Sequence, residues 1–371
     1  MRRTLAVLAV LVLPILAACG GSNTDESSNT TAAATQAEAQ SGFDQTQAAL
    51  EGLSGDERRA KLVELAQGEG GLSFYTSMSP SVVDEVVSAY EDAFDIDVAV
   101  YRATSETVLQ RLIEEARADF HGADTVESSG LEMVNLAHEG VLVPYASPSI
   151  DDVVPEAKAD GYTASRFNTF VVSWNTDLVP SGEEPKSWEE LADPKWKGRV
   201  AIEASDVDWY KTLWQYWADN GMSEEDADAL FERLAANSVI VKGHTVLAEL
   251  MAAGEFDVGV NYLHIVENVA AEGAPLAWQP AVQPVFPRAN GVGLVAGAEH
   301  PAAAMLFYDW LLAEGQDVLV EVNTTPVRTD LGSTGDLEQV AVDLPALAAD
   351  QQEWTDRWDR LLLLGEAAPE G

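Results

Sequence analysis

Apolar and polar positions alternate in a regular rhythm over the first half of the chain. Apolar residues three and four positions apart predict amphipathic helices over residues 56–67, 80–94, 105–118 and 131–138. Between them, short apolar or alternating runs predict strands over residues 70–77, 96–101 and 122–127. This alternation of strand and helix favours the α/β class, with a mostly parallel sheet covered by helices on both faces.

Two longer apolar strands, predicted over residues 167–175 and 283–295, interrupt this rhythm. A loop rich in Pro and Gly follows the first of them at residues 179–185, and a second α/β series then runs from residue 200 to about residue 276. Two long strands on either side of a self-contained segment indicate one domain interrupted by another, with two crossings of the chain between them. An amphipathic helix predicted over residues 344–364 closes the chain.

The N-terminal pattern is different. Arg2 and Arg3 precede an apolar run over residues 5–16, and two small residues separate that run from Cys19, the one cysteine of the chain. The run is shorter than the roughly 20 residues that span a bilayer, so it predicts a secretory signal. A lone cysteine forms no internal disulfide. Residues 20–54 are polar and small, and we expect them to form a disordered tether.

The net charge of the chain argues against some classes of binding partner. The chain carries 62 acidic and 21 basic residues, a formal net charge of −41. Such a surface argues against binding to nucleic acid or to anionic lipid, because both carry negative charge themselves. The acidity is consistent either with life in a salty medium or with an acidic, solvated exterior that serves solubility.

Five phrases together resemble one protein family. They are "LSFYTS", "GVLVPYASP", "PKSWEELADPKWKGRVAI", "GHTVLAELMAAGE" and "HPAAAMLFYDWLLAEGQ", which begin at residues 72, 140, 185, 243 and 300. In this order they resemble extracellular solute-binding proteins of bacterial ABC importers, in the branch similar to ferric-iron-type binding proteins, over residues 57–330. The tetrapeptide ending at Cys19 resembles a bacterial lipobox, which implies a lipid anchor on that cysteine; the alternative is an ordinary signal peptide with a chance cysteine.

The resemblance implies an α/β, two-lobed fold like that of type II periplasmic binding proteins, each lobe a mostly parallel sheet flanked by helices, joined by two crossing strands. The expected organisation is a signal peptide (1–18), a tether (19–54), the first part of lobe 1 (55–168), lobe 2 (175–283), and the second part of lobe 1 with C-terminal helices (288–371). The hinge strands are expected near residues 168–175 and 283–290. Ligand is expected between the lobes, at strand C-termini and helix N-termini.

On the first lobe, three strand-to-helix loops offer hydroxyl groups at this position. The candidate ligand-binding residues there are Thr76, Ser77, Ser105, Thr107, Ser128 and Ser129. Ser and Thr also cap helices without any ligand, so each loop has a plain structural alternative.

On the second lobe and the crossing strands, the candidates are Trp209, Tyr210, His244, Thr245, Tyr262, Arg288 and Asn290. The two aromatic residues at 209 and 210 could wall a pocket or pack in a core. His244 and Thr245 stand at a helix start, where an imidazole can donate to an anion or simply cap the helix. Arg288 suits a planar, bidentate contact with an anion.

The predicted cargo is a small polar or anionic ligand: a carboxylate, a phosphonate, a sugar phosphate or a metal chelate. Iron-binding relatives resemble one another in a pair of adjacent tyrosines, whereas Tyr262 is followed by Leu263 here. Direct ferric binding is therefore the alternative, and His264 is expected on a helical surface. The sequence carries no G-x-S-x-G, H-E-x-x-H or P-loop motif. We expect a monomer that is not an enzyme, needs no cofactor and delivers its ligand to an ABC permease outside the cytoplasm, anchored by lipid on Cys19.

Overall fold

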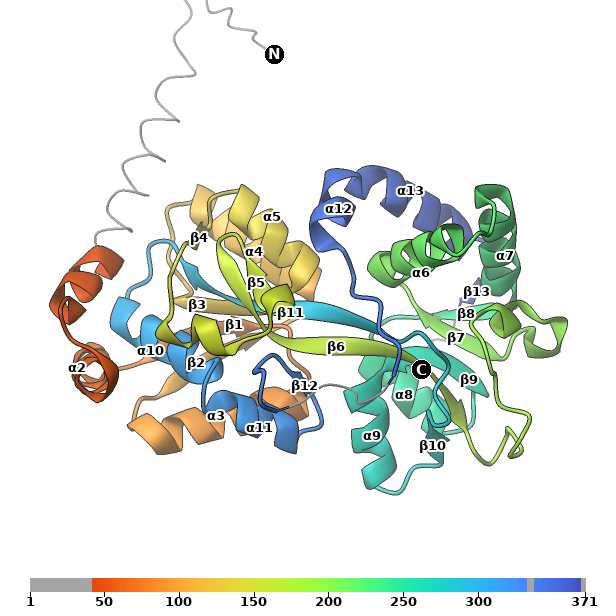
Figure 1. The fold of residues 1–371 in the computed structure, drawn as a ribbon, viewed down its shortest axis with the longest axis horizontal. Helices are drawn as coiled ribbons and strands as arrows, with labels where there is room; N and C mark the ends of the chain where they lie inside the picture. The colour runs from red at the N-terminus through yellow and green to blue at the C-terminus, as the bar shows by residue number, and fades with distance from the viewer. Residues whose placement is uncertain (1–41, 332–336, 368–371) are drawn as a thin grey trace, which may run out of the picture.

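A computed structural model describes residues 42–331 and 337–367. The chain forms two lobes joined by long strands (Figure 1). The expected signal peptide, the lipidated cysteine and most of the expected tether lie outside the described residues.

Lobe 1 contains three parallel strands that end towards the other lobe. The strands are β1 (Leu72–Thr76), β2 (Val98–Arg102) and β3 (Thr125–Ser129). Each leads directly into a helix: α3 (Pro80–Phe94), α4 (Ser105–Arg117) and α5 (Gly130–His138). Further helices of this lobe are α2 (Gly55–Glu69), α10 (Pro301–Leu311) and α11 (Gly315–Glu321). These elements confirm the predicted strand–helix rhythm.

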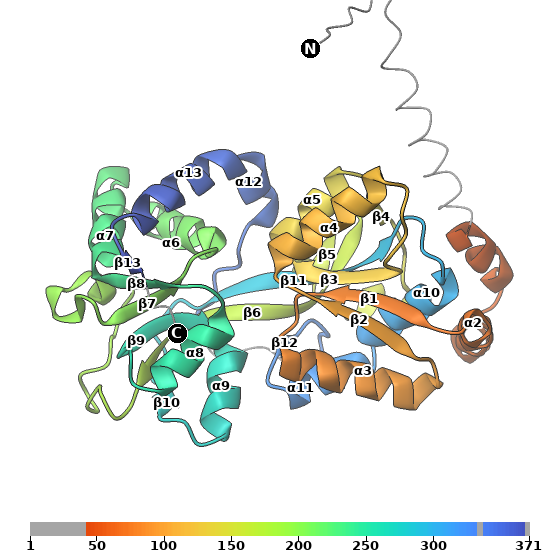
Figure 2. The same cartoon turned by 180° about the vertical axis from the view of Figure 1, so that it is seen from behind.

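Lobe 2 repeats this plan with parallel strands β7 (Val200–Glu203), β8 (Ser238–Val241) and β9 (Val258–Tyr262). Its helices are α6 (Val207–Asp219), α7 (Glu224–Asn237), α8 (His244–Ala252) and α9 (Leu263–Ala271). Helices α6 and α7 lie on one face of the strands, with α8 and α9 on the other (Figures 1 and 2).

Two long antiparallel strands, β6 (Tyr162–Asn175) and β11 (Phe286–Val295), carry the sheet from one lobe to the other. The strand order is β13-β8-β7-β9-β6-β11-β3-β1-β2. Within the crossing pair, Arg288 lies opposite Asn168 and Asn290 opposite Arg166. Because side chains alternate between the faces of a strand, these four polar residues point to one face.

Short elements complete the fold. Two-residue strands are β4 (Leu142–Val143), β5 (Lys158–Ala159), β10 (Leu276–Ala277), β12 (Thr325–Pro326) and β13 (Glu366–Ala367). Turns of 3-10 helix are η1 (Pro148–Asp152), η2 (Pro155–Ala157), η3 (Glu189–Ala192) and η4 (Pro194–Trp196).

The C-terminal segment spans both lobes. The single helix predicted over residues 344–364 is wrong: α12 (Leu344–Ala349) and α13 (Gln351–Leu362) are separate, with a break at Asp350. Helix α12 packs mainly against α5 of lobe 1, and α13 packs against α6 and α7 of lobe 2. Before them, the chain is hydrogen-bonded to the start of β11, through Val285 and the Pro287 carbonyl.

The end of the expected tether is ordered. Residues 42–50 form a helix, and Phe43 and Leu50 are buried in the core of lobe 1. The prediction of disorder is therefore wrong for residues 42–54. The two apolar residues are seven positions apart, which places them on one helix face, but a single pair in a polar stretch is a weak pattern.

Candidate functional site

The strand ends of both lobes gather charged and polar side chains around the crossing strands. We call the following set the interlobe cluster: Glu127, Glu132, Arg166, Glu203, Asp206, Asp208, His244, Tyr262, His264, Arg288 and Asn290. Arg288 links the two lobes electrostatically. Burial lowers the pKa of Arg288, whereas Tyr262 and Asp208 of lobe 2 and Glu132 of lobe 1 raise it, and the net shift is upwards. The cluster lies where the first lobe's parallel strands and the second lobe's parallel strands end towards each other (Figure 2).

A buried ion pair joins lobe 1 to the first crossing strand. Arg166 on β6 lies 3.0 Å from a carboxylate oxygen of Glu127 on β3, and both side chains are at least 98% buried. The other oxygen of Glu127 accepts a hydrogen bond from the Thr76 hydroxyl. Arg166 also donates to Asn168, while its Nε has no hydrogen-bond partner among the described residues. The guanidinium is thus fixed but keeps one N–H to offer.

A second buried ion pair joins lobe 2 to the other crossing strand. Arg288 Nη1 lies 3.0 Å from Asp208 Oδ2. The guanidinium also lies over the rings of Tyr262 (4.8 Å to the centroid) and Phe170 (5.5 Å), which hold it in place. In the part of the chain that the structure describes, neither its Nε nor the amide oxygen of Asn290 has a partner.

Three ionisable residues of lobe 2 form a compact group. Glu203, Asp206 and His244 each offer one ligand atom, and these atoms lie within 4.8 Å of one another. His244 Nε2 is 3.0 Å from Asp206 Oδ1. Glu203 accepts hydrogen bonds from the Ser205 N–H and hydroxyl and from the Gly243 N–H.

Burial shifts the pKa values of the cluster strongly. Loss of hydration raises the pKa of the Glu132 carboxyl to about 7, assisted by the negative charge of Glu106. Burial likewise raises the pKa of Asp206 to about 7, although His244 opposes the shift. The pKa of Tyr262 is raised well above its usual value and that of His264 is lowered well below it, both chiefly by burial. The cluster therefore contains ionisable groups whose uncharged forms are favoured unless a compensating charge lies beside them.

Of the hydroxyl-bearing residues predicted on lobe 1, some lie at the starts of α4 and α5, and others are half-buried or exposed. Ser105 and Ser129 are joined by a hydrogen bond of 2.6 Å between the starts of α4 and α5, and the neighbouring Ser128 hydroxyl is buried without a partner among the described residues. Ser77 is half-buried, and its N–H donates to the Glu127 carbonyl. Thr107 is exposed and bonds to Thr104, which caps α4.

The aromatic pair predicted on lobe 2 does not wall the cluster. The Trp209 ring is fully buried and packs against Trp188, Phe231 and Trp358. Tyr210 stacks on Trp358 as well. Of the two readings that the sequence left open for these residues, the structure gives core packing. Thr245 lies half-buried in the first turn of α8.

Several residues of the interlobe cluster were not predicted from the sequence. Asp206 and Asp208 belong to the stretch 205–210 that the sequence singled out for its aromatic residues, and Glu203 ends the strand before it. Among 62 acidic residues, the sequence gives no sign that these three differ from the rest. The placement of His264 on a helical surface is wrong, since it is 4% exposed. Its position in the first turn of a helix, two residues beyond the strand that ends at Tyr262, is the signal that could have placed it near the cluster.

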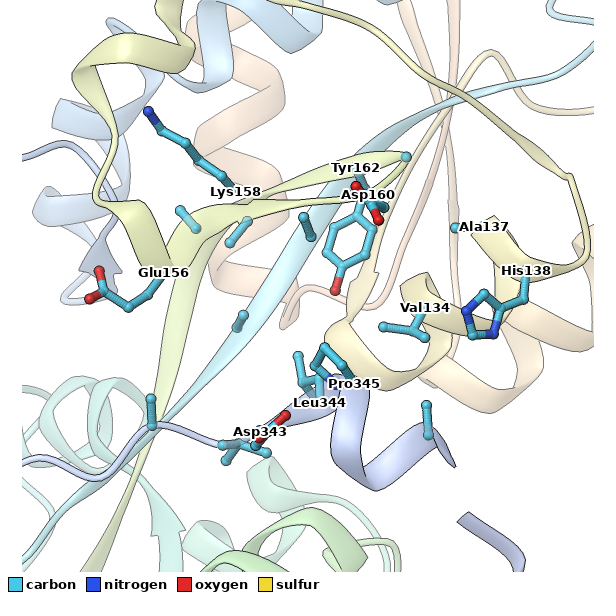
Figure 3. Close-up of a pocket in the computed structure, with 18 of the residues that line it drawn as sticks. Val134, Ala137, His138, Glu156, Lys158, Asp160, Tyr162, Asp343, Leu344 and Pro345 are labelled. Carbon is cyan, nitrogen blue, oxygen red and sulfur yellow. The ribbon is translucent and has the colours of Figure 1, made fainter. Parts of the chain in front are cut away.

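A separate groove of about 1010 Å³ lies on the other face of the crossing strands (Figure 3). Its lining includes Phe167, Pro287 and Ala289, which alternate with the cluster residues along β6 and β11. Helix α5 and the segment leading into α12 form its sides. It is mostly apolar and contains none of the predicted site residues.

Comparison with known proteins identifies the family. The model for bacterial extracellular solute-binding proteins matches residues 85–341. The chain belongs to this family. It is a solute-binding protein of the kind that serves ABC importers, and its fold is that of the two-lobed type II periplasmic binding proteins, which confirms the predicted fold class. The described residues contain no helix that is both long enough and apolar enough to traverse a bilayer.

One curated relative and two solved structures show what the chain is similar to. A Fe(3+)-binding periplasmic protein of Serratia marcescens is 23% identical, over 77% of this chain and 87% of its own. The solved structure of the periplasmic binding protein AfuA from Actinobacillus pleuropneumoniae, with fructose-6-phosphate bound, has a TM-score of 0.70 at 22% identity, covering 80% of this chain and 99% of its own. Iron-bound HitA from Pseudomonas aeruginosa has a TM-score of 0.65 at 19% identity, covering 78% and 99%.

Proposed function

We propose that this solute-binding protein captures a small organic oxyanion that also carries hydroxyl groups, of the sugar phosphate type, in the interlobe cluster. The observation that carries the proposal is the pair of buried guanidinium groups, Arg166 and Arg288, on neighbouring crossing strands. Each keeps a buried Nε–H without a partner among the described residues. A buried donor without an acceptor costs about 1–3 kcal/mol, so donors retained in this way favour an oxyanion ligand.

The carboxylates of the cluster indicate the rest of the ligand. Glu132 and Asp206 each have a buried oxygen that accepts no hydrogen bond from the described residues. An oxyanion alone would be repelled by these groups, whereas hydroxyl groups of the same molecule would donate to them. AfuA, whose solved structure holds fructose-6-phosphate, is consistent with a ligand of this mixed chemistry in this fold.

The wider role follows from the family and the sequence. The protein would act as a monomer outside the cytoplasm, hold its ligand unaltered, and deliver it to an ABC permease. The lipid anchor on Cys19 belongs to this proposal and would keep the protein at the membrane surface, since two or three acyl chains give stable anchoring. No enzymatic step is part of the proposal.

A thermal-shift panel tests the ligand class. The probes are fructose 6-phosphate, fructose, inorganic phosphate and ferric citrate, each with the wild type and with Arg288→Met. We expect fructose 6-phosphate to stabilise the wild type more than either of its parts does, and we expect this effect to disappear in Arg288→Met. Arg199→Met is the matched control, because Arg199 pairs with Asp257 at a partly exposed site. A wild type that fructose 6-phosphate stabilises no more than fructose or inorganic phosphate does would refute the proposal.

Ferric iron or an iron chelate is the second candidate, because relatives in this family include proteins named for ferric binding. Tyr262 supplies a buried phenol beside His244, with ring centroids 3.7 Å apart. The following residue, Leu263, offers no second phenol. In the panel, stabilisation by ferric citrate and by none of the other probes would favour this candidate.

A further inference from the structure

We infer that Glu203, Asp206 and His244 form a binding site for a divalent transition-metal ion, which bridges lobe 2 to the oxygen-rich ligand. The inference rests on the proposed function for the identity of the bridged ligand, but the metal site itself can be tested alone. All three residues belong to lobe 2, at the ends of the adjacent parallel strands β7 and β8. The site would therefore be complete before any movement of the lobes.

The spacing of the ligand atoms suits a metal ion. Two ligands, each about 2.1 Å from a metal and at about 90–110° to one another, lie about 3.0–3.4 Å apart. His244 Nε2 and Asp206 Oδ1 are 3.0 Å apart, and all three ligand atoms lie within 4.8 Å of each other. Small side-chain rotations would bring Glu203 to the same distance.

A buried oxygen also points to a missing cation. Asp206 is fully buried, and its Oδ2 has no hydrogen-bond partner among the described residues. A buried carboxylate with an unused oxygen is costly, and direct coordination would satisfy it.

The surroundings hold the ligands in place. Glu203 is oriented by two backbone N–H groups and the Ser205 hydroxyl, as outer-shell hydrogen bonds commonly orient metal ligands. The Ala204 carbonyl next to Glu203 accepts a hydrogen bond of 2.8 Å from Trp358 on α13. The segment that carries Glu203 and Asp206 is thus held by hydrogen bonds from Ser205 and Gly243 and from Trp358.

Charge explains why a cation belongs beside an anionic ligand. Within the cluster, Arg166 is paired with Glu127 and Arg288 with Asp208, so both guanidinium charges are already balanced. The carboxyl groups of Glu132, Glu203 and Asp206 have no guanidinium partner among the described residues, and only Asp206 pairs with a histidine there, His244. A divalent ion on lobe 2 would be attracted by Glu203 and Asp206 and would in turn attract the oxyanion. One imidazole and two carboxylates favour Zn²⁺, Mn²⁺ or Fe²⁺ over Mg²⁺ or Ca²⁺, which prefer oxygen ligands alone.

The experiment measures metal binding by the full chain in detergent, after EDTA treatment and its removal. Calorimetry with Mn²⁺ and Zn²⁺ should show one site per chain, and Mg²⁺ should bind at least about tenfold more weakly. With Mn²⁺, pulsed electron paramagnetic resonance should show coupling to an imidazole nitrogen. His244→Ala and the isosteric Asp206→Asn should each weaken binding at least about tenfold, and His244→Ala should remove the nitrogen coupling.

His300→Ala is the matched control. His300 forms the same kind of pair with Asp124 in lobe 1, at 2.9 Å, but in the described residues no second carboxylate completes a three-ligand group there. It should bind Mn²⁺ as the wild type does. Absence of binding by the wild type, or equal loss in the control, would overturn the metal site. Melting curves of Asp206→Asn would separate a lost ligand from lost folding.

Binding of fructose 6-phosphate with Mn²⁺ and with EDTA separates the two proposals. The bridge requires affinity to fall at least about tenfold in EDTA. Undiminished binding in EDTA would overturn the bridge and leave the proposed function standing. The protein could also bind Mn²⁺ through His244 and Asp206 but bind neither fructose 6-phosphate nor fructose. That result would support the metal site and refute the proposed sugar phosphate type of ligand.

Discussion

Replacing Glu132 with Gln should stabilise the protein at neutral and alkaline pH. Glu132 lies in the first turn of α5, and its Oε2 is buried without a partner among the described residues. Burial raises the pKa of this carboxyl from 4.5 to about 7. Because the folded-state pKa is the higher one, the contribution of this group is most favourable below about pH 4.5 and is lost as the pH rises through 7.

The magnitude follows from the same values. At about 1.4 kcal/mol per pH unit, the difference between 4.5 and about 7 corresponds to about 3 kcal/mol at pH 8 or above. Because the residue is half-buried, solvent screening reduces the gain, and we expect Glu132→Gln to add about 1–3 kcal/mol to the free energy of unfolding at pH 8. Near pH 4.5 the variant and the wild type should be equally stable, since a protonated Glu and a Gln are similar in shape and charge.

Urea unfolding at several pH values between 4.5 and 8.5 provides the assay. The stabilities of wild type and Glu132→Gln should diverge between about pH 4.5 and 7 and then stay apart by a constant amount up to pH 8.5. Glu139→Gln is the control on the same helix, because Glu139 is exposed, and it should follow the wild type. A Glu132→Gln variant that is less stable than wild type at pH 8, or differs from it by the same amount at pH 4.5 and at pH 8, would show that the carboxyl is not held in an unfavourable site.

Three further predictions concern other parts of the molecule. Arg166→Met should lower the free energy of unfolding by about 3–5 kcal/mol, because it leaves Glu127 buried without its partner, and Arg166→Met with Glu127→Gln should recover most of that loss in urea unfolding. Trp358→Phe should cost about 1 kcal/mol through the lost hydrogen bond to Ala204 and should weaken Mn²⁺ binding in calorimetry, whereas a purely structural role would leave that affinity unchanged. Cys19→Ser should move the protein from the detergent phase to the aqueous phase in phase partitioning, and unchanged partitioning would contradict a lipid anchor.

Much of the fold could be predicted because its signals are local. The spacing of apolar residues located α3 at 80–94 to the residue, and the two long apolar runs located the crossing strands. The C-terminal break could not be seen, because Asp350 interrupts the helix without a proline or glycine beside it. The helix at residues 42–50 is stabilised by the packing of Phe43 and Leu50 against lobe 1. This tertiary contact could not be predicted, because the surrounding stretch is polar.

The site was predictable only in outline. Strand ends and helix starts indicated His244 and Tyr262, and the second crossing strand indicated Arg288. The structure brings these three residues together in the interlobe cluster, and their role in ligand binding stays a prediction. The segment after β7 attracts attention through Trp209, an aromatic residue that belongs to the core, whereas Asp206 in the same segment belongs to the cluster. Nothing in a strongly acidic sequence distinguishes a buried carboxylate from the solvated majority. That distinction depends on tertiary burial.

The C-terminal segment ties the two lobes together outside the crossing strands. It is hydrogen-bonded to the start of β11, with α12 packed on lobe 1 and α13 on lobe 2, behind the strands that carry the cluster. If the lobes were to rotate towards each other on the cluster side, they would move apart on the groove side, and this segment would have to stretch or lose contacts. Part of the binding free energy of a ligand would then be spent on straining the segment, and that strain would favour reopening.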